Sequence, residues 1–407
     1  MNIVFLQDDF PPYAKGGAGI VAETLARALA GRGHQVAVIT AVQDKTLTGS
    51  FVEHGLRIER IYSDYAERWR GWRSLYNPAT VPAVRRVLAN IKPDIVHAHN
   101  IHYYLSYWSL RLARRTGARV FLTAHDAMLF HYGKLSPRRP HDLKVSAWQQ
   151  WREYRFWYNP FRNFFIKILL KNVSKIFAVS EALKEALNQN GIKNVAVIYN
   201  GVDTAVWHVD VHAVESFKKK YNLVGKKIIL FGGRVSGRKG GDIALAAVRD
   251  VVKSDPMATL VLLGRRDVYI DSLLMKADKW GIGANVLCAG WLSGDELHAA
   301  YAAATVVVVP SLYLDPLPTV VLEAMASRKP VIGANAGGIP EMVLNEQTGF
   351  ICDPHDTTTF AAMLERVLND LKLQQEMGEA GYERVKKYFS IDRWATETEK
   401  AYTNIYV

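Results

Sequence analysis

The chain has 407 residues, which predicts two or three domains at roughly 150 residues each. Hydrophobic residues make up 49% of it, which is enough for buried cores. The sequence has no run of about 18 apolar residues, so we expect no membrane-spanning helix. Residues 1–10 have the pattern of a strand instead of a signal peptide, and the two cysteines have no metal-ligand spacing, so we expect a cytoplasmic protein. The net charge of +12 predicts an anionic partner, which composition alone leaves open between nucleic acid, an acidic substrate and a membrane surface.

Short β-branched runs alternate with helical patterns along the chain. The expected strands are 2–6, 35–40, 94–99, 119–123, 175–179 and 195–199, then 227–231, 259–263, 286–289, 306–309 and 331–333. Such alternation predicts an α/β fold with parallel sheets covered by helices on both faces, and the two groups of strands predict two Rossmann-like domains. Turn residues after Asn200 place the boundary in the polar stretch that follows.

The first loop contains Gly16 and Gly17, between the first strand and a helix expected over residues 20–30. Glycines at a helix N-terminus let backbone N–H groups approach a phosphate or a substrate oxygen closely. The spacing does not match the G-x-G-x-x-G fingerprint of nicotinamide-cofactor domains, and the acid expected about 20 residues later is not evident. A tight structural turn is the alternative interpretation.

Histidines end two strands of the first group. His99 ends the strand 94–99, and His125, with Asp126 beside it, follows the strand 119–123. The carboxyl ends of parallel strands are where α/β sheets bind their ligands, so these side chains are candidates for a site. A structural role is the alternative for each histidine.

In the second half, Arg234 and Lys239 follow the strand 227–231 in the run GGRVSGRKGG. Arginine can hold a phosphate with two hydrogen bonds and lysine supplies a compact charge, and a departing diphosphate needs both as negative charge builds on it. No Asp-x-Asp pair is present, so no metal is expected. Solvated charges at a strand end are the alternative, and Arg238 is interpreted in that way.

Two acids, Asp315 and Glu323, lie eight residues apart after the strand 306–309. A polar turn follows Pro310 and a helix is expected from Thr319, so the two carboxylates face one crevice and the N–H groups of residues 317–320 point toward an anion. This arrangement suits a nucleotide sugar. The alternative is a solvated loop acid and a glutamate that the helix dipole stabilises.

In the joint spacing of these motifs the chain resembles, over nearly its whole length, the retaining glycosyltransferases of family 4, which carry an E-x7-E motif where this chain has Asp315 and Glu323. The resemblance implies a GT-B fold, with two Rossmann-like domains facing each other across a deep cleft. The acceptor-binding domain would comprise residues 1–205 plus 390–407, including a terminal helix with Trp394, Tyr402 and Tyr406 as anchors. The nucleotide-sugar-binding domain would comprise residues 206–389.

The resemblance also implies roles for particular residues. Arg234 and Lys239 would hold the donor diphosphate, Glu323 the ribose, and Asp315 the transferred sugar. The implied catalytic set is His125, Arg234, Lys239 and Asp315; the donor-binding set is Gly16, Gly17, Arg234, Lys239, Asp315, Leu317, Pro318, Thr319 and Glu323; the acceptor-binding set is His99 and Asp126. The loop 336–341 corresponds to a family element beside the donor. No metal and no cofactor besides the nucleotide sugar is expected.

Residues 146–165 contain nine aromatic side chains: Trp148, Trp151, Tyr154, Phe156, Trp157, Tyr158, Phe161, Phe164 and Phe165. Basic residues interleave with or flank them: Arg138, Arg139, Arg152, Arg155, Arg162, Lys167 and Lys171. Trp and Tyr favour the headgroup level of a bilayer, and each Lys or Arg near an anionic leaflet contributes about 1 kcal/mol, so the segment predicts a membrane-facing surface. A helix that packs its aromatic residues on its own core is the alternative. Nucleic acid is not an expected partner, because no recognisable nucleic-acid module accompanies the charge.

Together these patterns predict a retaining glycosyltransferase, peripheral to the cytoplasmic face of a membrane, in bacterial-type polysaccharide or glycolipid assembly. The donor would be a nucleoside diphosphate sugar, with a UDP-sugar favoured and GDP-mannose as the other candidate. The acceptor would be lipid-linked or a glycan. A sugar-phosphate or glycogen-type synthase on the same fold remains an alternative, as does an inactive binding paralogue, which the shorter acid Asp315 suggests.

Overall fold

The computed structural model describes residues 1–14, 16–136 and 142–403, so Arg138, Arg139 and Tyr406 lie outside the described part. The chain divides into two compact units, Met1–Asn200 with Ile391–Val407, and Gly201–Ser390. The boundary after Asn200 falls five residues before the boundary expected at residue 205. The earlier boundary has a local cause, because Val202 forms a parallel bridge with Ser390, and the Val202 N–H donates to Phe389 O at 2.9 Å.

The N-terminal unit contains one eight-stranded sheet, in the order β3-β4-β2-β1-β5-β6-β7-β8. Its strands are β1 (Asn2–Leu6), β2 (Gln35–Val42), β3 (Gly49–Glu53), β4 (Leu56–Tyr62), β5 (Ile95–Ala98), β6 (Arg119–Ala124), β7 (Lys175–Ala178) and β8 (Val195–Val197). Neighbouring strands are parallel except for β3 and β4, which form an antiparallel hairpin at one edge. The sequence prediction missed this hairpin, because β3 has no buried residue and charged residues interrupt the buried apolar residues of β4, so neither strand forms an apolar run.

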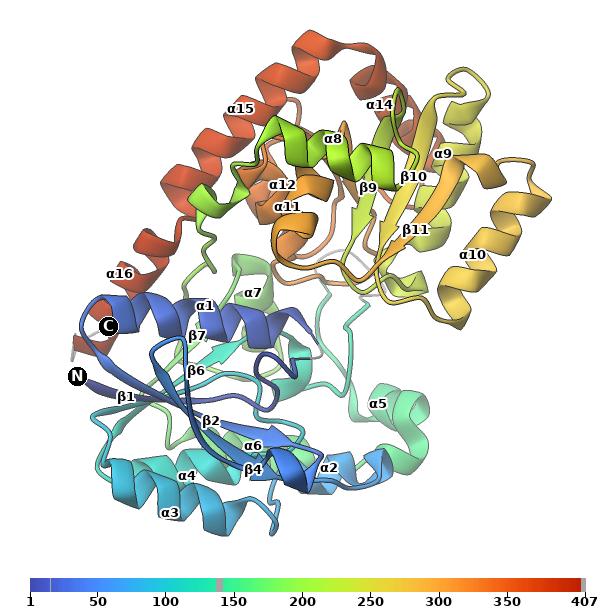
Figure 1. The fold of residues 1–407 in the computed structure, drawn as a ribbon. Helices are drawn as coiled ribbons and strands as arrows, with labels where there is room; N and C mark the ends of the chain where they lie inside the picture. Colours follow the sequence, from blue (N-terminus) through green and yellow to red (C-terminus); the bar gives the residue numbers. More distant parts are fainter. Residues whose placement is uncertain (15, 137–141, 404–407) are drawn as a thin grey trace. The chain divides into compact units, whose positions relative to one another are not determined.

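Helices cover both faces of this sheet (Figure 1). They are α1 (Gly17–Gly31), α2 (Arg70–Arg73), α3 (Val81–Ile91), α4 (Trp108–Arg115), α5 (Ala147–Tyr154), α6 (Arg162–Leu170), α7 (Glu181–Gln189) and α16 (Ile391–Thr403). Helices α1 and α7 lie on one face, and α3, α4 and α6 lie on the other. Helix α16 packs on α1 and buries Trp394 and Tyr402 in the core of this unit, as expected for the terminal helix.

The C-terminal unit contains a parallel six-stranded sheet, in the order β11-β10-β9-β12-β13-β14. Its strands are β9 (Lys227–Gly232), β10 (Ala258–Leu263), β11 (Val286–Gly290), β12 (Val306–Val309), β13 (Val331–Ala334) and β14 (Gly349–Cys352). The four valines of β12 are all buried, because helices cover both faces of a parallel sheet and leave no face for polar side chains.

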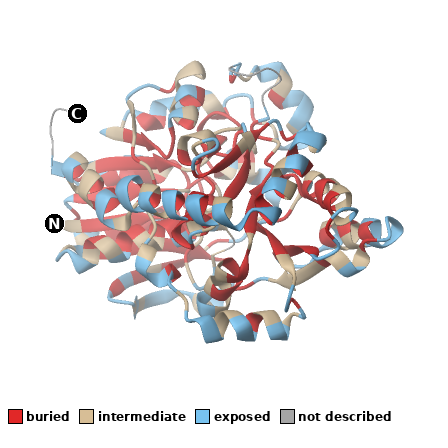
Figure 2. Cartoon of the chain, turned by 90° about the horizontal axis from the view of Figure 1, so that it is seen from above, coloured by how far each residue is buried: buried red, intermediate tan, exposed pale blue. Residues whose placement is uncertain are grey.

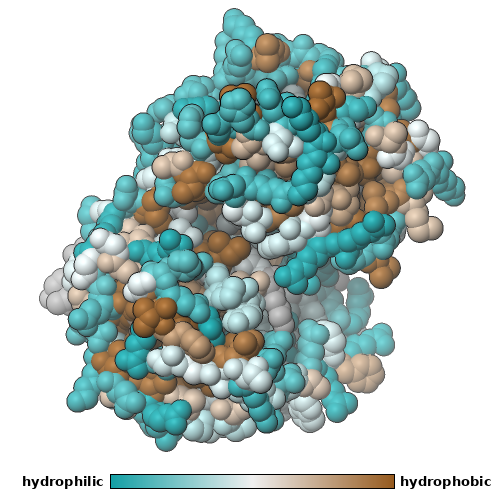
Figure 3. Space-filling model, in the orientation of Figure 1, coloured by the Kyte–Doolittle hydropathy of each residue, from teal (hydrophilic) through white to brown (hydrophobic). Residues whose placement is uncertain are grey.

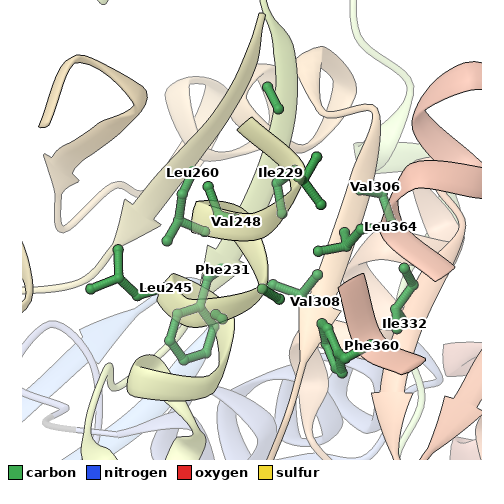
Figure 4. Close-up of a cluster of buried hydrophobic side chains, with 14 of the residues drawn as sticks. Ile229, Phe231, Leu245, Val248, Leu260, Val306, Val308, Ile332, Phe360 and Leu364 are labelled. Atoms are coloured by element: carbon green, nitrogen blue, oxygen red, sulfur yellow. The ribbon is translucent and has the colours of Figure 1, made fainter. Parts of the chain in front are cut away.

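The helices of this unit are α8 (Val211–Lys220), α9 (Gly241–Val252), α10 (Val268–Lys279), α11 (Gly294–Ala303), α12 (Thr319–Ala326), α13 (Ile339–Met342), α14 (Thr357–Asn369) and α15 (Leu371–Tyr388). Leu245 and Val248 of α9 and Phe360 and Leu364 of α14 pack on the strands in one apolar cluster (Figure 4). Most strand residues are buried, and helices turn their exposed residues outward (Figure 2). Within the described residues, no helix is long and apolar enough to span a bilayer.

Each sheet has a topological switch point, where the strand order reverses. In the N-terminal unit the chain moves outward from β1 to β2 on one side and from β5 to β8 on the other, so the switch lies between β1 and β5. In the C-terminal unit it lies between β9 and β12. In α/β proteins, the loops that follow such strands diverge at the carboxyl ends of the strands, and ligands bind in the crevice between the loops.

Candidate functional site

The C-terminal unit joins Lys239 and Asp315 at the switch point between β9 and β12. Lys239 ends a 3-10 turn after β9, and Asp315 lies in the loop between β12 and α12. The Lys239 Nζ donates to Asp315 Oδ2 at 2.6 Å, with only 16% and 5% of the two side chains exposed. Ser311 Oγ donates to the same oxygen at 2.9 Å. The loops after the two diverging strands are therefore linked by a largely buried ion pair.

Lys239 keeps its positive charge at this place. Burial lowers the pKa of Lys239, but the Asp315 carboxylate and the Tyr313 side chain outweigh burial and raise that pKa above its usual value. The Tyr313 ring lies 5.5 Å from the ammonium nitrogen. The site thus holds a charged ammonium group that an anionic ligand can contact, with Asp315 as its partner within the protein.

Two glycines let the loops close around Asp315. Gly240 has a φ of +83°, and a Cβ there would lie 2.0 Å from Pro310 O. Gly337, in the loop 336–341 that the sequence singled out, has a φ of +59°, and its Cβ would lie 2.1 Å from Asp315 O. The neighbouring Gly338 N–H donates to that same oxygen at 2.9 Å. Any larger residue at Gly240 or Gly337 would push the loops apart. It would also have to adopt the left-handed backbone conformation of these two positions, which favours glycine.

Glu323, on α12, accepts a hydrogen bond from the Tyr301 hydroxyl of α11 at 2.5 Å. Burial raises the pKa of Glu323, while hydrogen bonds from Tyr301 and Thr319 and the charge of Lys239 act to lower it. A Cβ on Gly232, at the end of β9, would lie 3.1 Å from the Tyr301 oxygen. Glu323 is therefore oriented by a buried tyrosine that packs beside the end of β9.

Helix α12 begins at Thr319, after the buried residues Leu317 and Pro318. Among the described residues, no side chain caps its N-terminus, and its first turn contains no acid. The unused N–H groups of this turn carry the positive end of the helix dipole, which favours an anion. Arg234 stands apart from this network: its side chain is exposed, and within the described part of the chain no hydrogen bond or ion pair holds it.

In the N-terminal unit, the structure brings the predicted His99 and His125 into contact at the ends of β5 and β6. Their rings stack, and His99 Nδ1 lies 2.8 Å from His125 Nε2. Burial lowers the pKa of His125 to about 4 and holds that of His99 well below its usual value. Both rings are therefore neutral at pH 7, and one donates its N–H to the other.

Asp126 caps the 3-10 turn Ala127–Leu129 by accepting from Met128 N–H at 2.9 Å. Its Oδ2 lies 3.9 Å from Nε2 of the buried His102. His99, His102 and Asp126 line a cavity of about 10 Å³, which has room for about one water. The buried Nε2 of His99, one of the residues that line this cavity, has no hydrogen-bond partner among the described residues.

The glycines of the first loop differ from the prediction. Helix α1 begins at Gly17, so Gly17 and Gly19 belong to its first turn instead of the loop before it. The φ of Gly16 is −157°, an extended value, and apart from chain neighbours no atom of the described residues lies within 4 Å of a Cβ on Gly16 or Gly17. The fold requires glycine at Gly19, where a Cβ would lie 2.5 Å from Asp9 O. Gly16 and Gly17 instead leave open space beside the helix N-terminus.

Sequence reasoning missed several residues of these sites. Asp8, directly after β1, accepts from the N–H groups of Tyr103, Tyr104 and Leu105 at 2.6 to 2.8 Å and thereby ties the loops after β1 and β5 together at the switch point. His97 lies two residues before His99 and contacts it, with 4.4 Å between the ring centroids. The His-Ala-His spacing was a usable signal, because alternate residues of a strand share one face. Tyr301 and Ser311 had no such local signal.

Comparison with known proteins defines the class. Residues 15–206 match the family described as Glycosyltransferase Family 4, and residues 213–384 match the family described as Glycosyl transferases group 1. Together the two matches span most of the chain, and it belongs to the family 4 glycosyltransferases of GT-B fold. This confirms the resemblance predicted from the motifs.

Similar proteins extend over the full chain. Glycogen synthase of Mycobacterium tuberculosis is 26% identical over 99% of this chain and 94% of its own. Among solved structures, sucrose-phosphate synthase from Thermosynechococcus elongatus has a TM-score of 0.79 at 23% identity and covers 98% of both chains. Anabaena Alr3699/HepE in complex with UDP-glucose has a TM-score of 0.74 at 19% identity and covers 98% of this chain and 99% of its own. The two structures share the fold of this protein.

Proposed function

We propose that this glycosyltransferase uses a nucleoside diphosphate sugar, in the first place a UDP-sugar, and transfers the sugar with retention of its anomeric configuration and without a metal. The observation that carries the proposal is the cluster at the β9/β12 switch point: a charged Lys239, its partner Asp315, and Glu323 beside an uncapped helix N-terminus. An ammonium group and free N–H groups suit a diphosphate, and a carboxylate suits sugar hydroxyls. HepE, which has the same fold, binds UDP-glucose.

In the proposed mechanism the bond between the anomeric carbon and the departing phosphate oxygen breaks, and a bond to the acceptor oxygen forms on the same face. The acceptor proton passes to the departing phosphate. Lys239 and Arg234 stabilise the negative charge that develops on the diphosphate, and Lys239 exchanges part of its contact with Asp315 for the phosphate. Asp315 binds the transferred sugar, and Glu323 binds the ribose. The neutral His125 stabilises the positive charge that develops on the sugar.

We place the acceptor on the N-terminal unit, near His99 and Asp126, and propose a lipid-linked or glycan acceptor in bacterial-type polysaccharide or glycolipid assembly at the cytoplasmic face of a membrane. One observation favours a second candidate, a glycogen-type or sugar-phosphate synthase, because glycogen synthase is similar over nearly the whole chain. A polyglucan or sugar-phosphate acceptor would distinguish it. GDP-mannose remains the alternative donor.

The test is a thermal-shift screen with UDP, ADP, GDP and their sugars, with and without EDTA, followed by NMR of the product. We expect UDP and one UDP-sugar to stabilise the protein equally well in EDTA, and the product to keep the anomeric configuration of the donor. Stabilisation by GDP alone would move the donor to GDP-mannose. Loss of turnover in EDTA, or an inverted product, would contradict the mechanism. Absence of both donor hydrolysis and transfer would support an inactive paralogue.

A further inference from the structure

The N-terminal unit carries an exposed aromatic surface that comes from two separate segments, residues 69–76 and 148–168, and is called the aromatic face below. The second segment was expected from the sequence, and the structure adds the first. Its most exposed members include Phe156 (93%), Trp148 (67%), Phe164 (63%), Trp72 (51%), Trp69 (50%) and Trp151 (46%). In the space-filling view, tan and white side chains are interspersed with teal ones around α5 (Figure 3).

Direct contacts join the two segments. A Cβ on Gly71 would lie 2.6 Å from Trp157 O, so α2 packs closely on the turn after α5. Asn159 Nδ2 donates to Gly71 O at 3.1 Å. Residues more than 80 positions apart in the sequence thus pack together, which brings the two exposed aromatic segments next to each other.

The aromatic side chains of this face do not build the core. Ile166, Leu169 and Leu170 of α6 are buried, whereas Phe164 and Phe165 of the same helix are exposed. The interpretation of these aromatic residues as core therefore does not hold. Apolar side chains gathered on one face are typical of an interaction site, because water disfavours a large exposed apolar patch.

The charge around the face is predominantly positive. The exposed basic residues are Arg152, Arg155 and Lys167 in the second segment and Lys171 just after it, against the single exposed acid of that segment, Glu153. On the neighbouring α4, the exposed Arg111 lies 5.0 Å over the Trp108 ring, which contacts the exposed Tyr76. Trp and Tyr beside Arg and Lys match the interface of an anionic bilayer, where rings lie at the headgroup level and cations meet lipid phosphates.

Arg162 does not share this role, although the sequence grouped it with the other basic residues. It is 2% exposed, and it donates to Met128 O at 2.6 Å and to His131 O at 3.3 Å. It therefore fixes α6 to the loop that follows His125 and Asp126. Arg70 reaches the same loop from α2, with its Nη2 3.0 Å from Met128 Sδ.

We propose that the aromatic face docks this protein on an anionic lipid bilayer. The docking presents the loop after His125 to headgroups, so the acceptor is a membrane lipid or is lipid-linked; this part rests on the proposed function. The partner is a bilayer instead of a second copy of the chain, because the positive charge that surrounds the rings would repel the same charge on a copy.

The experiment is co-sedimentation of the full chain with vesicles of phosphatidylcholine alone or mixed with phosphatidylglycerol, at low and high salt. The aromatic variant replaces Trp72, Trp148 and Phe156 by Ser, and the charge variant replaces Arg152, Arg155 and Lys171 by Gln. A matched control replaces Trp280, Met275 and Val268 by Ser, since these apolar side chains are exposed on the C-terminal unit. A second control replaces Lys193, Lys219 and Lys279 by Gln.

We expect wild type and both controls to bind anionic vesicles at low salt and to bind more weakly at high salt, because salt screens headgroup attraction. The charge variant should lose about 100-fold in affinity, from about 1 kcal/mol for each of three charges. The aromatic variant should lose at least about 10-fold at either salt concentration. All variants should retain wild-type hydrolysis of a soluble UDP-sugar, which tests the donor site separately from docking.

Three results would overturn the proposal: wild type that fails to bind anionic vesicles at low salt, folded variants that bind as tightly as their controls, or light scattering that shows a dimer which the aromatic variant abolishes. The last result would identify the face as an interface between copies. If docking succeeds and no UDP-sugar is hydrolysed, the proposed donor is wrong and the docking inference stands.

Discussion

Replacing Lys239 by Met tests whether the ion pair with Asp315 organises the candidate donor site. The substitution leaves the Asp315 carboxylate, 5% exposed, without its cation and with the neutral Ser311 and Tyr313 side chains as hydrogen-bond partners. Removing one partner of a buried pair destabilises a protein by about 3–5 kcal/mol, because an uncompensated charge stays buried. For a unit of this size we expect the melting temperature to fall on the order of 10 °C.

The double variant Lys239→Met/Asp315→Asn separates stability from function. The neutral amide that Asp315→Asn introduces can be buried without a compensating charge, so we expect the double variant to recover most of the stability that Lys239→Met loses. Turnover of the donor should be about 30- to 1,000-fold slower than in wild type in both variants, since about 2–4 kcal/mol of transition-state stabilisation disappears with the ammonium group. Melting curves and initial rates of UDP-sugar consumption measure the two effects.

The pair between Lys276 and Asp242 is a matched control in the same unit, because both side chains are 47% exposed. Lys276→Met should change stability by less than about 1 kcal/mol and leave turnover intact. The reasoning is refuted if Lys239→Met melts as wild type does and keeps full activity, or if the double variant stays as unstable as the single one.

Further predictions concern the same two sites. Glu323→Gln should weaken binding of both UDP and the UDP-sugar in calorimetry. Asp315→Ala should leave UDP binding intact, because Lys239 remains, and should weaken binding of the UDP-sugar only. Equal losses for both ligands in both variants would contradict the separate roles of Glu323 and Asp315. Tyr301→Phe should reduce UDP affinity about fivefold through the lost hydrogen bond to Glu323, whereas Tyr221→Phe, which removes a similar hydrogen bond to Glu296, should leave UDP affinity unchanged. Gly337→Ala should destabilise the protein by more than about 2 kcal/mol, because its Cβ would lie 2.1 Å from Asp315 O, whereas Gly17→Ala, with open space around it, should be tolerated. Stability in urea should fall as pH drops from about 6.5 toward 4, because burial lowers the pKa of His125 to about 4 and that of His97 to about 3, so the unfolded chain binds more protons in this range. Asp8, whose pKa burial raises to about 7, acts in the opposite direction, so Asp8→Asn should steepen this fall and His125→Gln should flatten it.

The sequence determined the features that depend on neighbours along the chain. Buried parallel strands are continuous apolar runs, so the four valines of β12 and the run in β9 were visible without a structure. Motif residues that follow such strands lie at their carboxyl ends, which is why Asp315, Lys239 and His125 could be named as site candidates. The family followed from the joint spacing of these motifs, and the β3–β4 hairpin was missed because its two strands lack such a run.

Only the tertiary structure decided which of these residues meet. Lys239 and Asp315 are 76 positions apart, and they form a pair because β9 and β12 are neighbours in the sheet, a fact that no local pattern records. Burial separated Arg162, which is structural, from Arg152, which is exposed, although both appear in the sequence as basic residues among aromatic ones. Trp69 and Trp72 belong to the aromatic face because Gly71 packs closely on Trp157 in the folded chain. Side-chain partners and exposure depend on how distant segments pack, and a local pattern constrains only its own segment.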